Sequence, residues 1–164
     1  MRNRLWMELC QAKWNNKYCA VLLTYRRRVL NWVTILILVF SGAGVMGWKF
    51  WETMPFISCL IISAIQIVRL VQPHLFPTEK QIEKLEFVTD FYFDYYNKLE
   101  KLWFDYENER IDEENTQLEF YKLKDSEKEV NKIINEVIKT VDKKMKEKCD
   151  KATEEYFNRL IVII

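Results

Sequence analysis

The chain has 164 residues and an almost balanced charge, with 25 basic and 24 acidic side chains. The charges segregate along it, because residues 1–28 carry a net charge of +6, residues 29–77 of +1 and residues 78–164 of −6. The acidic C-terminal half disfavours direct nucleic-acid binding. All three glycines lie between Gly42 and Gly47, which excludes a glycine-rich phosphate-binding loop.

The first predicted element is a basic amphipathic segment over residues 1–28, helical from about residue 3 to residue 27. Leu5, Leu9 and Trp14 recur in it at helical spacing. Its basic and aromatic side chains suit either a surface of anionic lipid headgroups or packing against later helices of the chain. The sequence leaves both interpretations open.

Two apolar runs follow, over residues 29–48 and about 54–72. The first lacks charged side chains, and at about 1.5 Å per residue it is roughly 30 Å long, the thickness of a bilayer core. Arginines before the first run and near the end of the second favour the cytoplasmic side. We therefore predict a transmembrane hairpin over residues 29–72, with both termini in the cytoplasm. The predicted cytoplasmic-side anchor is Arg26, Arg27 and Arg28.

Each predicted span carries a stripe of polar or small residues. Because an unpaired polar group is costly in lipid, these residues either pack the spans together or line a water-filled path formed by several copies. The candidate pore or span-packing residues are Asn31, Thr34, Ser41, Gly44, Ser63, Gln66 and Arg69.

Pro73 and Pro77 separate the predicted spans from a cytosolic helical domain over residues 73–164. They form the candidate hinge, since proline interrupts helices. Thr78 and Gln81 match a capping box at the start of the next helix.

Two long helices are predicted in this domain, from about residue 78 to 110 and from about 125 to 160, with a turn near Asp112–Asn115. Their apolar residues follow coiled-coil spacing, and we expect the resulting seams to join copies of the chain in a homo-oligomer. The predicted oligomer seam comprises Leu85, Val88, Tyr92, Tyr95, Leu99, Leu102, Tyr106, Val130, Ile134, Val137 and Val141. The predicted fold is thus all-α, a two-span transmembrane hairpin plus a bundle of long helices.

Catalytic constellations are missing from the sequence. His74 is the single histidine, and Cys10, Cys19, Cys59 and Cys149 show no CxxC spacing. We therefore expect no enzyme activity, no cofactor and no metal site.

The order of segments also suggests a family. Trp14-Asn15-Asn16-Lys17-Tyr18-Cys19 and Tyr25-Arg26-Arg27-Arg28 precede the two apolar runs, and Gln72-Pro73 precedes a long aromatic helix. This layout resembles the SLATT family, two-transmembrane effectors associated with bacterial nucleotide-signalling and reverse-transcriptase antiviral defence systems.

The resemblance implies an effector that permeabilises or depolarises the bacterial inner membrane and so causes abortive infection. Its implied partners are the lipid bilayer, further copies of the chain and an operon-encoded sensor or nucleotide-signal enzyme that triggers it. The alternative is a non-conducting membrane anchor or scaffold that recruits a cytosolic partner.

Overall fold

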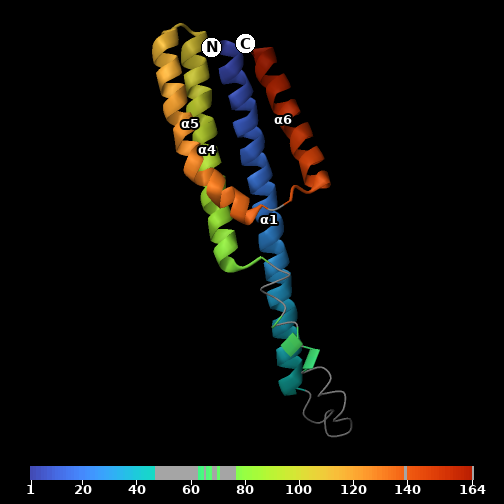
Figure 1. Ribbon diagram of the computed structural model, residues 1–164. Helices are drawn as coiled ribbons and strands as arrows, with labels where there is room; N and C mark the ends of the chain where they lie inside the picture. The colour runs from blue at the N-terminus through green and yellow to red at the C-terminus, as the bar shows by residue number, and fades with distance from the viewer. Residues whose placement is uncertain (47–62, 65, 68–69, 71–76, 139, 164) are drawn as a thin grey trace. The chain divides into compact units, whose positions relative to one another are not determined.

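The structure is a computed structural model that describes residues 1–46, 63–64, 66–67, 70, 77–138 and 140–163. They form helices α1 (Arg2–Met46), α4 (Glu79–Glu107), α5 (Glu113–Val137) and α6 (Lys143–Ile163) (Figure 1). Within these residues there is no β-strand, so the all-α part of the prediction is confirmed for them. The chain divides into a bundle unit, Met1–Leu23 with Glu83–Ile164, and a second unit, Thr24–Ile82.

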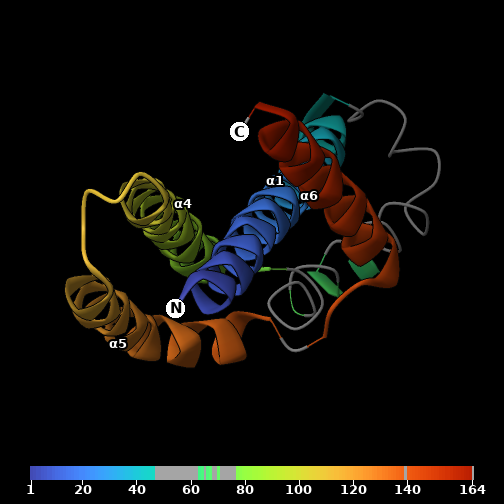
Figure 2. The ribbon, with the colours of Figure 1, turned by 90° about the horizontal axis from the view of Figure 1, so that it is seen from above.

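In the bundle unit, the first part of α1 lies between α4 and α6, and α5 lies against the α4 side (Figure 2). Side-chain contacts set the helix directions. Trp6 packs against Phe157 with ring centroids 5.1 Å apart, and Trp14 Nε1 donates a 2.7 Å hydrogen bond to Asp150. Because the earlier residue on α1 meets the later residue on α6, these two helices run antiparallel.

The core of the bundle unit joins the amphipathic face of α1 to the heptad seam of α4. Leu5, Leu9 and Ala12 are buried in it. The α4 seam supplies most of the remaining apolar surface through the buried residues Leu85, Val88, Tyr92, Tyr95, Leu99 and Leu102, with Tyr106 half-buried. Of the two interpretations of residues 3–27, the structure therefore shows packing against later helices.

The start of α4 follows the predicted capping box. The backbone N–H of Gln81 donates to Thr78 Oγ1 at 3.3 Å, and the backbone N–H of Thr78 donates to Gln81 Oε1 at 3.3 Å. The capping box thus gives the Thr78 N–H an acceptor and adds a second acceptor for the Gln81 N–H, which also donates to the Thr78 backbone carbonyl at 3.0 Å.

The connection from α4 to α5 lies slightly before the predicted position. Glu109 has a positive φ of 54°, in the left-handed region, where the chain leaves α4. Asp112 caps α5, because its side chain accepts a hydrogen bond from the backbone N–H of Asn115 at 3.1 Å. The predicted turn at Asp112–Asn115 is therefore the N-cap and first turn of a helix.

The last predicted helix, over about 125–160, is wrong as a single element. α5 ends at Val137 and α6 begins at Lys143. Asp142 explains the new start, because its carboxylate accepts from the backbone N–H of Met145 at 3.0 Å. Its own N–H donates to Tyr18 Oη at 3.3 Å, a contact with α1 that heptad spacing does not reveal. As a result Val141, predicted in the seam, is 50% exposed.

The predicted transmembrane hairpin is also wrong. Among the residues that the structure describes, no helix has an apolar stretch long enough to cross a membrane. The described side chains of α1 that follow the three arginines include two polar ones, Asn31 and Thr34. The second apolar run, about 54–72, lies mostly outside the described residues.

This finding also bears on three predictions that depended on the hairpin. Two of them, the inner-membrane location with both termini cytoplasmic and the description of the chain as a membrane and pore-forming protein, are wrong for this reason, whereas the third, a lipid bilayer as partner, stays a prediction.

The buried face of α1 gives a direct test of the packing. Leu9 is 0% exposed and Met7, two residues away, is 69% exposed. We expect Leu9→Ala to lower the free energy of unfolding by about 2–5 kcal/mol, because it leaves a cavity in the core. Met7→Ala should change it by less than about 0.5 kcal/mol. Urea unfolding of both variants measures the difference, and equal effects would contradict the placement of Leu9 in the core.

Candidate interaction surfaces

A polar network joins α1, α4 and α5 inside the bundle unit. Lys124 Nζ donates to Glu8 Oε1 at 2.6 Å and to Glu127 Oε2 at 3.1 Å. Tyr95 Oη donates to Glu8 at 3.1 Å, and Tyr92 Oη donates to Glu127 at 3.0 Å. Burial acts to lower the pKa of Lys124, but its bonds to the two carboxylates outweigh burial and raise that pKa. One ammonium therefore serves two largely buried carboxylates.

A second polar contact joins α1 to α4 and α6. The ammonium nitrogen of Lys13 lies 3.8 Å from the ring centroids of both Tyr96 and Tyr156. The two tyrosine hydroxyls are 2.6 Å apart, and Tyr156 Oη also donates to Glu100 at 2.8 Å. Burial lowers the pKa of Lys13, while the nearby Glu100 opposes that shift. Attraction between a cation and two ring faces thus ties three helices together at one point.

The described cysteines do not form a reactive site. Cys19 and Cys149 are buried thiols. Burial, with a smaller contribution from Cys149, raises the pKa of Cys19 to about 12, so its thiolate is scarce at neutral pH. Nor do the described histidine, cysteine, aspartate and glutamate side chains include a group of three that could hold a metal ion.

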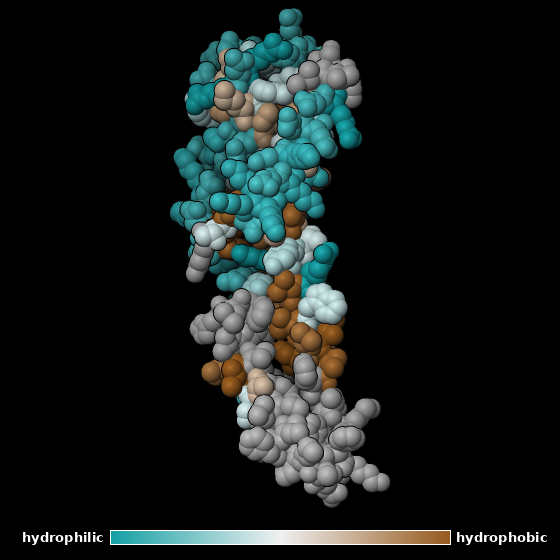
Figure 3. All heavy atoms as spheres, turned by 90° about the vertical axis from the view of Figure 1, so that its right-hand side faces the viewer, coloured by the Kyte–Doolittle hydropathy of each residue, from teal (hydrophilic) through white to brown (hydrophobic). Residues whose placement is uncertain are grey.

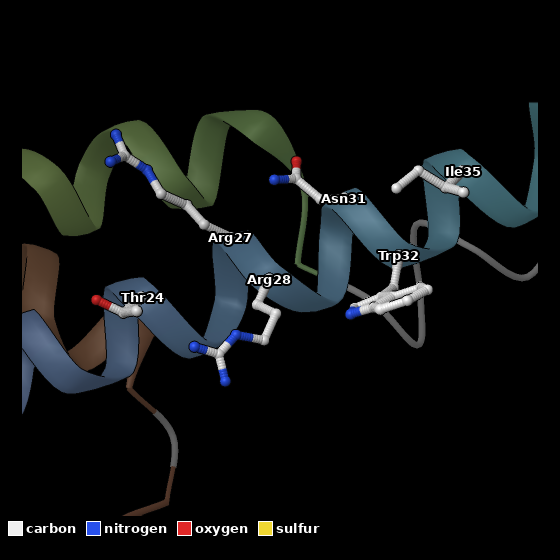
Figure 4. Close-up of a pocket in the computed structure, with 6 residues that line it drawn as sticks. All are labelled: Thr24, Arg27, Arg28, Asn31, Trp32 and Ile35. Carbon is white, nitrogen blue, oxygen red and sulfur yellow. The ribbon is translucent and has the colours of Figure 1, made fainter.

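The second unit carries a surface pocket of about 420 Å³ along α1 (Figure 4). The Arg28 guanidinium and the Trp32 indole project on the same side of the helix, whereas Arg27 and Asn31 project on another side. The pocket is lined by Thr24, Arg27, Arg28, Asn31, Trp32 and Ile35. Because a single helix supplies all of these residues, the pocket is a shallow surface feature and not an enclosed cavity.

Large apolar side chains continue from this pocket along α1. Trp32 is 60% exposed, and it belongs to a set that falls within an arc of about 100° when each residue advances the helix by 100°. We call this set the α1 row, and it consists of Tyr25, Trp32, Ile35, Leu36 and Val39. Figure 3 shows hydrophobic side chains gathered along this part of α1, while most of the remaining coloured surface in that view is hydrophilic. Contiguous exposed apolar surface of this kind marks interaction sites.

A pocket of about 540 Å³ lies in the bundle unit at the connection between α4 and α5. Its charged side chains are largely paired, since Arg2 donates to Glu107 at 2.9 Å and the N-terminal ammonium of Met1 lies 3.0 Å from Glu113. Because these charges neutralise one another, the pocket offers little attraction to a charged ligand.

The structure places the predicted span residues as follows. Asn31 lines the α1 pocket, and Thr34 Oγ1 donates to the backbone carbonyl of Leu30 at 3.0 Å. Ser63 and Gln66 are exposed. Ser41 and Gly44 belong to α1 beyond the last of its side chains that are described, and Arg69 lies outside the described residues.

The remaining predicted residues lie in three places. Of the candidate hinge, Pro77 is half-buried two residues before α4, and Pro73 lies outside the described residues. Arg27 and Arg28 line the α1 pocket, and Arg26 precedes them on the same helix. The predicted oligomer seam packs inside the chain's own bundle, apart from the exposed Val141. A role for it between copies stays a prediction.

The α1 row was not predicted from the sequence, because Trp32, Ile35, Leu36 and Val39 were assigned to a membrane span. The signal was nevertheless present. Tyr25, Trp32 and Val39 are spaced seven residues apart, with Leu36 between the last two, which is the spacing of a helix–helix contact.

The Lys124 network gives a matched test of buried against exposed ion pairs. We expect Lys124→Met to lower the free energy of unfolding by about 1–3 kcal/mol, because Glu8 and Glu127 lose their shared cation. Lys122→Met removes an exposed pair with Glu119 and should cost less than about 0.5 kcal/mol. Chemical denaturation measures both, and similar losses would show that Lys124 has no special role.

No protein-family model matches the chain, and neither a curated protein nor a solved structure proved similar to it.

Proposed function

We propose that the chain is a non-enzymatic assembly protein, in which the bundle unit is a stable platform and the α1 row binds another protein. The observation that carries this proposal is the exposure of five large apolar side chains in register on one helix. In a folded chain such surface is stabilised by burial against a complementary partner.

The exposed area of the α1 row limits how much binding free energy its apolar contacts can contribute. About half of each side chain is exposed, so burial of the five would contribute roughly 5 kcal/mol in total. Association itself costs an estimated 4–15 kcal/mol in lost freedom. Apolar contact of the row therefore offsets only the lower end of that cost, and a stable complex also needs contacts to the charged residues beside the row, foremost Arg28.

The contacts inside the bundle unit suit a platform. The Lys124 network and the Lys13 contact join α1 to each of the other three helices through charged groups. Breaking such a contact leaves a largely buried charge without its partner, which is strongly unfavourable. The bundle unit should therefore keep its structure when a partner binds to α1.

The resemblance to SLATT effectors supports a setting for this role. In that setting the chain would assemble in a bacterial antiviral defence system, in response to an operon-encoded sensor or nucleotide-signal enzyme. Permeabilisation of a membrane is not part of the proposal, because the predicted spans on which it depended are corrected above.

Photo-cross-linking in cells tests the proposal. A benzophenone amino acid at position 32 should give a discrete protein adduct, and the same group at the exposed Gln117 of α5 should not. Leu36 and Leu118 provide a matched pair, since both leucines are 51% exposed. We expect Leu36→Asp to reduce the adduct at least about tenfold through loss of apolar contact, and Leu118→Asp to leave it unchanged. The absence of any adduct specific to position 32 would refute an assembly role for this face.

A further inference from the structure

The outer surface of α4 carries exposed aromatic and acidic side chains together. At 100° per residue they fall within an arc of about 120°, opposite the buried seam of the same helix. We call this set the α4 outer face, and it consists of Glu83, Phe87, Asp90, Phe93 and Asp94, all exposed. Two phenylalanines that are each 55% exposed on a surface helix are unusual for a chain that stays alone.

The α1 row has the opposite charge. The helix segment from Thr24 to Met46 contains the three arginines Arg26, Arg27 and Arg28 and no acidic residue. Arg28 is exposed and projects on the same side of α1 as Trp32 (Figure 4). One exposed helix face is therefore aromatic and basic, and the other is aromatic and acidic.

We propose that the α4 outer face of one copy of the chain binds the α1 row of a second copy. Arg28 of one copy would pair with Asp90 or Asp94 of the other, and Trp32 would pack against Phe87 and Phe93. This inference rests on the proposed function and names its partner. Charge complementarity selects the occupant, since opposite charges steer association and like charges oppose it.

The same charges disfavour a contact between two identical faces. A parallel contact between two α1 rows would place the arginines of one copy opposite those of the other, so that like charges repel. Contact between two α4 outer faces would place Asp90 and Asp94 against their own counterparts. The mixed contact is the arrangement of these two surfaces in which opposite charges meet.

A mixed contact has a geometric consequence. Each copy would offer one basic and one acidic face. Two copies can exchange both contacts in a two-fold dimer, or each copy can use its two faces on different neighbours, and repetition then gives a closed ring or an open chain.

A charge exchange on the purified full chain tests the contact. Light scattering and sedimentation would compare wild type with Arg28→Glu, Asp94→Arg, the double variant and an equimolar mixture of the two single variants. Each single variant should raise the dissociation constant at least about tenfold, since like charges then face each other. The mixture and the double variant should recover association, because each restores an opposite-charge pair. Lys132→Glu and Glu129→Arg reverse exposed charges on α5 and should have no effect.

The outcomes separate this inference from the proposed function. Weakening by Arg28→Glu without weakening by Asp94→Arg would overturn the α4 outer face as the binding surface. A wild-type chain that stays monomeric, while position 32 still cross-links to a different protein in cells, would overturn the second copy as partner and leave the assembly role standing. If position 32 gives no specific adduct, the proposed function itself fails.

Discussion

Burial of the first turns of α1 among three helices that come much later in the chain is the contact on which the bundle depends. Two charged side chains of this helix, Glu8 and Lys13, contact all three of the others. Glu8 accepts from α4 and α5, and Lys13 lies against rings of α4 and α6. Without α1, Lys124 would keep only one of its two carboxylates, and the rings of Tyr96 and Tyr156 would lose their cation. The bundle is thus organised around α1 and is not a set of equivalent helices.

Local physics explains what the sequence predicts well. The capping box at Thr78 and Gln81 and the buried seam from Leu85 to Leu102 depend on spacing within one helix, which a sequence displays directly. Heptad spacing does not specify which helix covers a seam, so residues expected between copies lie inside one chain. The break before α6 involves a contact between Asp142 and Tyr18, residues far apart in sequence.

The wrong prediction of a transmembrane hairpin has a similar cause. Hydrophobicity alone does not distinguish a helix in lipid from a helix with an exposed apolar row, since both have few charges. The exposed residues Trp32, Leu36 and Val39 form a row only because they lie on one side of the helix axis, and hydrophobicity alone does not contain that information. Segregated charge was the more informative property of the sequence. In the structure the basic N-terminal segment meets the acidic helices through contacts such as Arg2–Glu107 and the N-terminal ammonium with Glu113, and the proposed assembly pairs the basic α1 row with the acidic α4 outer face.

The position of α1 in the chain has a consequence for biosynthesis. Its partners are far away in sequence, since Glu8 and Lys124 are 116 residues apart, and Trp14 and Asp150 are 136 apart. Most helical bundles form from neighbouring segments and fold quickly, whereas these contacts close very long loops. At about 5–20 residues per second, α1 emerges from the ribosome several seconds or more before α6 is made. During that interval its core face and its exposed row are both uncovered, so a nascent chain presents two apolar faces of one helix to chaperones before it can present a folded surface to anything else.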